Sequence, residues 1–164
     1  MAVFPPPDAV RSLRRALPAS ASLTRAEKWH VTVVFLGEVD GPRVDAVAEI
    51  LSGVAPPRPF GLRLAGGGRF GEVAWAGLDG DLDQLGALRD ELRTALAAGG
   101  FPSDERPYNP HLTVSYHGDA ATRRALAEFS GQPWEVAEFA LIRSRAGEYE
   151  QLRAWPMARS RPGR

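Results

Sequence analysis

Apolar residues recur along this chain with two periods, and these predict helices and strands in alternation. Spacings of three and four residues, typical of an amphipathic helix, occur at 8–17, 41–54, 82–98 and 120–129. Runs rich in β-branched and aromatic residues, typical of strands, occur at 28–36, 60–65, 73–78, 112–116, 134–144 and 149–155. Residues 1–4 are apolar but leave room for no more than a stub of a strand.

The order of these elements predicts the fold class. Helices and strands are interspersed as two roughly repeated units, each with hairpins and helices, which favours an α+β architecture of sheets lined by outer helices. A length of 164 residues is usual for one domain and allows a substantial core. We therefore expect a single domain over 1–164, built from two lobes, with a frayed basic tail at 159–164.

One short motif occurs twice in the predicted strands. The sequence His-Val-Thr-Val at 30–33 recurs as His-Leu-Thr-Val at 111–114, about half the chain later. Because side chains alternate along a strand, the His and Thr of each copy point to one face, roughly 7 Å apart, and the residue between them points to the other. This pattern predicts a shared groove to which each lobe contributes one strand.

Two histidines that face one groove suit acid/base cleavage of a phosphodiester. Opening a ribose 2′,3′-cyclic phosphate needs a base that activates water and an acid that protonates the departing ribose oxygen. Imidazole, with an ordinary pKa of roughly 6.5, serves either role near neutral pH. The hydroxyls of Thr32 and Thr113 can donate hydrogen bonds to phosphate oxygens. His30, Thr32, His111 and Thr113 are therefore the candidate site.

Two other interpretations of the histidines remain open. Each could be a structural residue whose ring nitrogens are satisfied locally. His30, His111 and His117 could also form a three-histidine zinc site, although threonine is a poor ligand and neither motif has a neighbouring carboxylate. The recurrence of the motif favours acid/base chemistry without a metal or another cofactor.

Composition sets the cellular context. The 20 basic and 20 acidic residues cancel, so no global field draws the protein to nucleic acid, and a local patch must hold any RNA substrate. The chain has no cysteine, which excludes a disulfide framework and a thiol nucleophile. It also lacks a long apolar span and the pattern of a signal peptide. We expect a cytoplasmic protein without membrane contact and, since no exposed apolar stripe is evident, a monomer.

Both copies of the motif lie in longer segments that resemble the signatures of the 2H phosphoesterase superfamily. The segments are His-Val-Thr-Val-Val-Phe-Leu-Gly-Glu-Val at 30–39 and Arg-Pro-Tyr-Asn-Pro-His-Leu-Thr at 106–113. The resemblance extends to 68–71, 100–102 and 144–155. Within the superfamily, the chain is most similar to the RNA 2′,3′-cyclic phosphodiesterases of bacteria and archaea, historically called 2′-5′ RNA ligases.

The resemblance implies a bilobal fold, in which two pseudo-symmetric lobes of antiparallel sheet with outer helices surround a central cleft. It implies metal-independent hydrolysis of 2′,3′-cyclic phosphate ends of RNA or oligonucleotides to 2′-phosphates. By position, it implies that His30 is the proton donor and His111 the proton acceptor. Two alternatives stay open: reversible 2′-5′ RNA ligation as the physiological reaction, and a module that binds RNA ends or nucleotides without turnover.

Further residues are candidates for substrate binding or for packing. Many relatives carry an arginine five residues after the second histidine, where this chain has Tyr116. Regular alternation places Tyr116 opposite His111, so we expect it in the core; a twist or bulge would bring it to the cleft, where it could stack on a base. Phe35 is expected in the core by the same alternation. The arginines that could contact RNA phosphates are Arg69, Arg106, Arg143 and Arg145.

Overall fold

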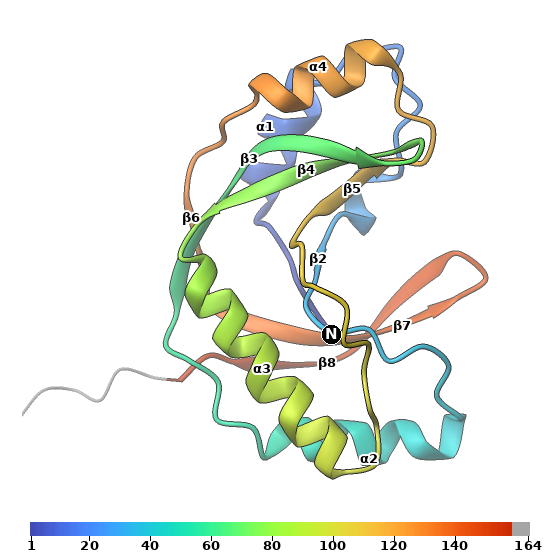
Figure 1. Ribbon diagram of the computed structural model, residues 1–164, viewed down its shortest axis with the longest axis vertical. Coiled ribbons are helices and arrows are strands. Elements are labelled where there is room, and N and C mark those ends of the chain that lie inside the picture. The colour runs from blue at the N-terminus through green and yellow to red at the C-terminus, as the bar shows by residue number, and fades with distance from the viewer. Residues whose placement is uncertain (159–164) are drawn as a thin grey trace, which may run out of the picture.

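The computed structural model describes residues 1–158, in which helices and strands alternate (Figure 1). The helices are α1 (Pro7–Ala16), α2 (Gly41–Ser52), α3 (Leu82–Ala98) and α4 (Ala120–Glu128), with a 3-10 turn at Ala26–Lys28. The strands are β1 (Ala2–Val3), β2 (Val31–Thr32), β3 (Phe60–Phe70), β4 (Val73–Gly80), β5 (Leu112–Ser115), β6 (Trp134–Val136), β7 (Glu138–Arg145) and β8 (Glu148–Pro156). None of the helices within this range is long and apolar enough to cross a membrane. The predicted tail at 159–164 lies outside the described residues.

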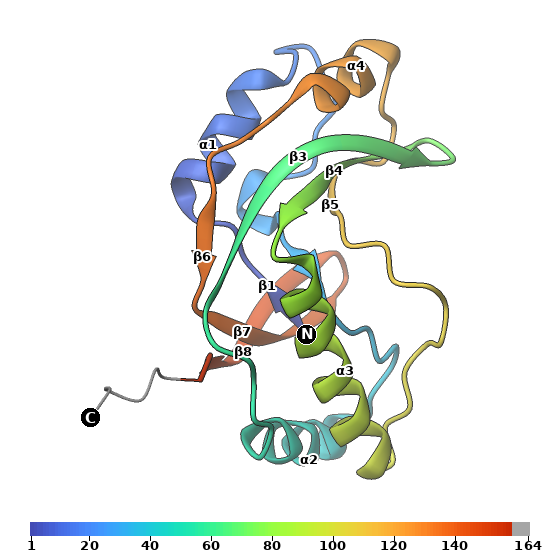
Figure 2. The ribbon, with the colours of Figure 1, turned by 60° about the vertical axis from the view of Figure 1, so that its left-hand side comes forward.

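The strands form two antiparallel sheets of four strands each, in the orders β2-β1-β7-β8 and β5-β4-β3-β6. Figure 2 shows the long β3–β4 ribbon curving above the sheet that contains β7 and β8. The predicted α+β class with two lobes is confirmed. We call the part around the first sheet the His30 lobe and the part around the second the His111 lobe, because each histidine directly precedes the edge strand of its sheet.

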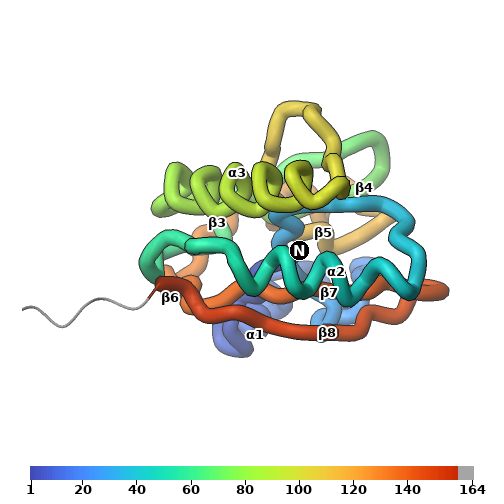
Figure 3. Tube along the Cα trace, turned by 90° about the horizontal axis from the view of Figure 1, so that it is seen from below, coloured from blue at the N-terminus to red at the C-terminus, as the bar shows by residue number. Residues whose placement is uncertain are grey.

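The helices tie the two lobes together. Helices α1 and α4 both pack on β3, in the His111 lobe, although α1 follows β1 of the other lobe. Helices α2 and α3 pack on each other and lie beside the His30 lobe (Figures 1 and 3), although α3 follows β4 of the His111 lobe. Each lobe thus receives a helix that the chain reaches from the other sheet.

Leucines along one face of α3 anchor the core. They recur at intervals of three and four residues, as an amphipathic helix requires, and are 0% exposed: Leu85, Leu88, Leu92 and Leu96. They belong to one continuous apolar cluster that also contains Leu64 of β3 and Phe139 of β7. The two lobes therefore share a core and hold each other in place.

The segment 28–36 forms less strand than its sequence predicts. Only Val31–Thr32 pairs as a strand, and its partner β1 is itself two residues long. Beyond this pairing, the N–H groups of Val33 and Val34 both donate to the carbonyl oxygen of Met1. The short partner strand therefore limits the length of β2. The periodicity of the segment 28–36 contains no information about that partner.

The segment 134–144, predicted as one strand, is divided between the two sheets. Residues Trp134–Val136 pair with β3, and Glu138–Arg145 pair with β1 and β8. The chain therefore passes from the His111 lobe to the His30 lobe at this point. Strand β3 also continues to Phe70, through glycines that the sequence predicts as a loop.

Strands β2 and β5, which carry the two motifs, each lie at the edge of a sheet. They are also neighbours in space, near the middle of the molecule (Figure 1). An edge strand has one side without a partner strand, and here the two edges approach each other from opposite lobes. The fold thus brings together two motifs that lie about half a chain apart in sequence.

Candidate active site

The two histidines are anchored in the same way. Nδ1 of His30 lies 2.7 Å from the carbonyl oxygen of Lys28, and Nδ1 of His111 lies 2.7 Å from that of Asn109. A carbonyl oxygen only accepts hydrogen bonds, so Nδ1 carries the hydrogen in both rings. In each ring, Nε2 is left as the atom that takes up or gives a proton.

The threonine of each motif lies on the same side of its strand as the histidine. Val31 and Leu112, which separate the pairs, are 0% exposed, whereas Thr32 and Thr113 are half-buried. Oγ1 of Thr32 lies 3.2 Å from Nε2 of His30. The predicted alternation holds in both motifs, and it directs two imidazoles and two hydroxyls away from the core.

Each histidine is flanked by two aromatic rings. The ring of His30 has its centroid 5.9 Å from that of Phe4 and 5.3 Å from that of Tyr149. The ring of His111 lies 5.1 Å from Phe70 and 5.8 Å from Trp75. These contacts restrict rotation of the imidazoles, so that Nε2 is fixed in direction as well as in protonation. All four flanking side chains lie outside the motifs' own strands, which is why the repeat alone does not identify them.

A glycine makes room for the aromatic pair beside His111. Gly68 of β3 lies opposite Trp75 of β4 in the strand register, and a Cβ atom at position 68 would lie 2.5 Å from the Trp75 ring. The indole can therefore lie across β3, where it meets Phe70 at a centroid distance of 5.2 Å. The Gly-Arg-Phe-Gly segment thus supports the second histidine through packing.

A hydrogen bond ties the two motifs to each other. The hydroxyl of Tyr108 donates to the carbonyl oxygen of Thr32, at 2.8 Å, and the guanidinium of Arg89 lies 4.7 Å from the centroid of the Tyr108 ring. Tyr108 directly precedes Asn109, whose carbonyl holds His111. The backbone that orients one histidine is therefore bonded to the strand that carries the other.

The residues that lead into the first motif also support the second. The hydroxyl of Ser115 donates to the carbonyl oxygen of Ser22 at 2.6 Å, and the N–H of Thr24 donates to that of Val114 at 2.8 Å. The indole N–H of Trp29 in turn donates to the Thr24 hydroxyl at 2.8 Å. Each motif is thus held partly by the chain around the other one.

The electrostatics of the first motif differ from those of a free histidine. Burial lowers the pKa of His30, and the hydrogen bond to the carbonyl of Lys28 partly offsets this effect. The charges of the Met1 amino group and of His111 lower this pKa further. The charge of His111 therefore acts on His30 from the facing edge of the other lobe.

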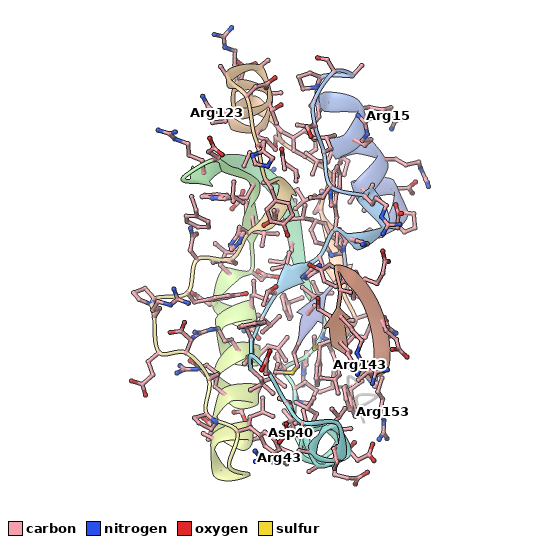
Figure 4. The ribbon with its side chains drawn as sticks, turned by 90° about the vertical axis from the view of Figure 1, so that its right-hand side faces the viewer. Arg15, Asp40, Arg43, Arg123, Arg143 and Arg153 are labelled. Carbon is pink, nitrogen blue, oxygen red and sulfur yellow. The ribbon has the colours of Figure 1, made fainter. Side chains whose placement is uncertain are left out.

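A cavity of about 760 Å³ opens beside His30 and Thr32. Its volume falls within the range of roughly 300–1,000 Å³ that is typical of small-ligand sites. Phe35 lines it and is 72% exposed, so the expectation that Phe35 belongs to the core is wrong. The segment after β2 leaves the ladder, and strict alternation stops before residue 35. Arg143 of β7 and Asp40 before α2 line the same cavity and lie on the same side of the molecule (Figure 4).

Tyr116 faces solvent and not the core, because β5 contains a bulge. The register pairs Thr113 with Trp75 but Ser115 with Ala74, so one extra residue of β5 is inserted between these pairs. A bulge of this kind exchanges the faces of the residues that follow it. Tyr116 is 57% exposed, and the prediction that it packs in the core is wrong.

The other candidate arginines differ in where they lie. Arg106 is exposed and pairs with Asp104 in the loop before β5. Arg69 is exposed on β3. In the part of the chain that the structure describes, neither guanidinium is hydrogen-bonded to His30 or His111. Arg145 lines the cavity beside His30, as Arg143 does.

His117 is paired with a glutamate and not with the other two histidines. Its Nδ1 atom lies 3.3 Å from Oε2 of Glu72, in the turn between β3 and β4. Within residues 1–158, no three His, Cys, Asp or Glu side chains are grouped as ligands of one metal ion. The arrangement of a three-histidine zinc site is therefore not formed by these side chains.

Two tyrosines at the site were missed by the sequence analysis. Tyr108 lies inside the second signature segment and Tyr149 inside the C-terminal segment of resemblance. Their position in these segments of resemblance was the one feature of the sequence that could have marked them as site residues. Neither tyrosine follows a pattern of alternation that points to the histidines, so their contacts emerge only from the fold.

Comparison with known proteins places the chain in a family. The model of the 2′-5′ RNA ligase superfamily matches residues 4–148. An RNA 2′,3′-cyclic phosphodiesterase of Geobacillus stearothermophilus is 32% identical over 153 residues, which are 84% of this chain and 48% of that protein. An RNA 2′,3′-cyclic phosphodiesterase of Escherichia coli K12 is 27% identical over 146 residues, which are 85% of this chain and 82% of that protein. The chain spans about half the length of the Geobacillus relative and, at 65%, about two thirds of that from Aeropyrum pernix.

Solved structures show the same fold. The E. coli LigT structure with 3′-AMP matches with a TM-score of 0.77 at 24% identity, over 96% of both chains. The Thermus thermophilus protein TT0787 matches with a TM-score of 0.77 at 23% identity, over 95% of both chains. At these identities, the likeness establishes the architecture. Together with the family model, it shows that the chain belongs to the 2′-5′ RNA ligase superfamily.

Proposed function

We propose that the protein hydrolyses 2′,3′-cyclic phosphate ends of RNA or oligonucleotides to 2′-phosphates, without a metal ion. One observation carries the proposal. Two histidines from opposite lobes, at the start of neighbouring strands, each have Nδ1 bonded to a backbone carbonyl and so leave Nε2 for proton transfer. The relatives named RNA 2′,3′-cyclic phosphodiesterase support the choice of substrate.

In the proposed reaction, a water oxygen attacks phosphorus and the bond from phosphorus to the ribose 3′-oxygen breaks. His111 Nε2 accepts the proton that leaves the water, and protonated His30 gives its Nε2 proton to the departing 3′-oxygen. The products are a 2′-phosphate and a free 3′-hydroxyl. The two rings end in the opposite protonation states, and exchange with solvent restores them. The same steps in the same direction, with a 5′-hydroxyl as the nucleophile in place of water, would join RNA ends through a 2′-5′ linkage and leave a free 3′-hydroxyl.

The threonines and the arginines are assigned supporting roles. Thr32 and Thr113 donate to the nonbridging oxygens as negative charge builds there. Thr32 is within 3.2 Å of Nε2 of His30, so its hydroxyl and this nitrogen can meet the same phosphate. A bound phosphate also offsets the effect of burial on His30, because an adjacent anion favours the protonated imidazole. Arg143 and Arg145, at the cavity, are placed for the RNA backbone, whereas Arg69 and Arg106 would contact only a longer substrate.

Exposed aromatic rings support a nucleic-acid end as the ligand. The large hydrophobic side chains on the surface include Phe35 in the cavity, Phe4 and Tyr149 beside His30, and Phe70 beside His111. Stacking of a base on such a ring stabilises binding by roughly 1–3 kcal/mol. Since Phe35 and His30 line one cavity, a phosphate at His30 would place its base within reach of Phe35.

The direct test is incubation of the protein with adenosine 2′,3′-cyclic phosphate in EDTA. We expect adenosine 2′-phosphate as the product. A 3′-phosphate product, or turnover only after metal is restored, would contradict the proposal. Binding without turnover, unchanged in the alanine variants of both histidines, would identify a receptor for RNA ends. Adding RNA with a 5′-hydroxyl end to the same assay measures how much of the cyclic phosphate is joined.

We further propose that the chain acts as a single domain, as a monomer, and in the cytoplasm. The shared core of the two lobes supports one folding unit, and the absence of cysteine suits a reducing compartment. Light scattering coupled to size-exclusion chromatography tests the monomer. A dimer mass at micromolar concentration would contradict it.

A further inference from the structure

The only lysine of the chain lies beside the first motif, and all the other basic residues are arginines. Lys28 ends the 3-10 turn before β2, and its carbonyl oxygen binds Nδ1 of His30 at 2.7 Å. Its side chain is only 19% exposed, although it carries a charge. Lysine is seldom buried to this extent unless it is paired, so the partners of this ammonium indicate its role.

The partners of the Lys28 ammonium lie at the tip of the β7–β8 hairpin. Nζ donates to the carbonyl oxygen of Gly147 and lies 3.3 Å from Oε1 of Glu148. It also lies 5.6 Å from the centroid of the Tyr149 ring, within the range of a cation–π contact. We call these contacts of Lys28 with Gly147, Glu148 and Tyr149 the hairpin latch. Arg25, which is more exposed, pairs with the same carboxylate.

The hairpin tip has a strained backbone that the latch helps to hold. Arg145 pairs with Glu148 in the strand register, so Ala146 and Gly147 are the two central residues of the turn. Their φ angles are 51° and 76°, which is typical of the type I′ turn of a two-residue hairpin loop. Glycine adopts a positive φ freely, whereas alanine does so rarely and at a cost. Surrounding contacts must keep such a residue in place, and the latch supplies one directly after Ala146.

The latched tip contacts the His30 ring itself. Tyr149 lies edge-on to this ring, with centroids 5.3 Å apart and planes at 88°, and it lines the cavity. Lys28 is therefore joined to His30 in two ways. Its carbonyl holds Nδ1, and its ammonium holds the residues that place Tyr149 against the imidazole. The first contact fixes which nitrogen carries the hydrogen, and the second restricts the tilt of the ring.

The other lobe holds its histidine through a different side chain. The carbonyl that binds Nδ1 of His111 belongs to Asn109, and the preceding residue, Tyr108, donates to the carbonyl oxygen of Thr32. In both lobes, a side chain at or next to the residue that binds the imidazole is tied to a distant segment. That segment is the first motif for the His111 lobe and the hairpin tip for the His30 lobe.

We propose that Lys28 is a positioning residue, which holds His30 through the hairpin latch with the hydrogen on Nδ1 and with Nε2 toward the substrate. Without the ammonium, the 3-10 turn and the hairpin tip lose the less exposed of the two cations that join them. The carbonyl of residue 28 and the Tyr149 ring then both shift relative to the imidazole. Lys28 acts through His30 and not on the phosphate. This inference rests on the proposed function, because it names what aligns one of the two proton-transferring groups.

The test is Lys28→Met, which keeps most of the side-chain length and removes the ammonium. A small misplacement of a catalytic group lowers the rate strongly. With adenosine 2′,3′-cyclic phosphate, we therefore expect kcat to fall about tenfold, with KM within about twofold.

The matched control is Arg43→Met, at the contact between α2 and the residues that follow α3. Arg43 also donates to a glycine carbonyl, that of Gly100, and also lies over an aromatic ring, that of Phe101 at 4.3 Å. Its replacement removes a cation with the same kinds of contact and should leave kcat within about twofold. Equal losses of kcat in the two variants would contradict the positioning role of Lys28.

Nitrogen NMR of the histidine rings at about pH 8, where imidazole is neutral, tests the position of His30 directly. In the unaltered protein, His30 and His111 should both carry the hydrogen on Nδ1, because each Nδ1 faces a carbonyl oxygen. In Lys28→Met, the His30 signals should move toward the mixture of tautomers of free imidazole. His111 should keep its tautomer and is the internal control. A change of tautomer in both rings, or none at His30, would overturn the proposal.

A milder variant, Glu148→Gln, weakens the latch and leaves Lys28 in place. Exposed ion pairs contribute little to stability, so this variant should fold. We expect about a threefold loss of kcat. Asp79→Asn, which removes an exposed carboxylate from the cross-strand ion pair with Arg63, is the control and should change kcat less than twofold. Equal values for these two variants would contradict the latch.

The double variant Lys28→Met/Glu148→Gln shows whether the carboxylate acts through the ammonium. If it does, the double variant should lose no more kcat than Lys28→Met alone, because the two residues form one unit. Losses that multiply would contradict the latch.

Failure of the proposed function is distinguishable from failure of this inference. If the unaltered protein does not turn over adenosine 2′,3′-cyclic phosphate, the proposed function fails. The NMR comparison needs no turnover. A change of the His30 tautomer in Lys28→Met, with His111 unchanged, would then still support the positioning role, and an unchanged His30 tautomer would overturn it.

Discussion

The His30 lobe and the His111 lobe present the same catalytic unit in different surroundings. In both, a histidine precedes an edge strand, Nδ1 is 2.7 Å from a carbonyl oxygen two residues earlier, and two aromatic rings flank the imidazole. The difference lies in what surrounds this unit. Burial lowers the pKa of His30, and the large cavity opens beside that ring.

The comparison separates two properties of the site. Local hydrogen bonds, repeated in both lobes, decide which nitrogen exchanges protons. Burial and neighbouring cavities, which differ between the lobes, decide how readily a ring is protonated and where the substrate lies. Burial lowers the pKa of His30, so its proposed service as an acid depends on the negative charge of bound phosphate. A symmetric motif can thus perform an asymmetric reaction.

The largest expected effect comes from removing either histidine. His30→Ala and His111→Ala should each lower kcat/KM by about 10²- to 10⁴-fold, because each deletes one proton transfer. The comparison is sharpened with a substrate whose leaving group needs no protonation. Such a substrate should largely rescue His30→Ala but not His111→Ala. Rescue of His111→Ala instead would reverse the assigned roles.

The matched control for these variants is His117→Ala. That side chain is exposed and pairs with Glu72, so its removal should leave kcat/KM within about twofold. A loss of kcat/KM as large as that of His30→Ala or His111→Ala would show that His117 takes part in the reaction.

The support of His111 by packing is broken by Gly68→Ala. The new Cβ would lie 2.5 Å from the Trp75 ring, and overpacking of this kind costs roughly 1–3 kcal/mol of stability. We expect a loss of that size in urea unfolding, with a fall in kcat because Trp75 and Phe70 shift against His111. Gly86→Ala is the control, since a Cβ there meets nothing within 4 Å. In the interior of α3, it should raise stability by about 0.5–1 kcal/mol. Equal stability of the two variants would contradict the packing argument.

The link between the lobes is broken by Tyr108→Phe, which removes one hydroxyl and keeps the ring under Arg89. We expect kcat to fall about tenfold with KM nearly unchanged, because the loop that orients His111 loses its bond to Thr32. Stability should fall by about 1 kcal/mol. Ser52→Ala, which breaks the 3.0 Å bond from Trp155, should cost similar stability. If Ser52→Ala lowers kcat equally, the effect of Tyr108 is general destabilisation and not alignment.

The smallest effect concerns pH. The pKa of folded His30 lies below its unfolded value of roughly 6.5, so between the two values the unfolded chain binds more protons. The free energy of unfolding should therefore fall as pH drops through this window and level off below the folded pKa. Urea unfolding of the protein and of His30→Ala across pH 5–8 measures the difference. A difference that favours the unaltered protein on acidification would contradict the burial effect on His30.

Much of the architecture followed from periodicity. The helices at 82–98 and 120–129 and the two motif strands were predicted because burial of one face imposes a repeat on the sequence. Periodicity did not predict the division of 134–144 between two sheets, since both halves are apolar and the crossing point depends on which strands lie nearby. It also failed at Tyr116, where one extra residue in β5 exchanges the faces.

The amino-acid sequence by itself determined the pair of histidines, their threonines and the face that each occupies, because alternation along a strand is a local property of the backbone. It also determined the family, through the two signature segments. Only the tertiary structure decided that the two motif strands lie on facing sheet edges, that Tyr108 joins them and that Tyr149 packs on His30. These relations join residues far apart in the chain, and they depend on packing, register and bulges that no local pattern contains.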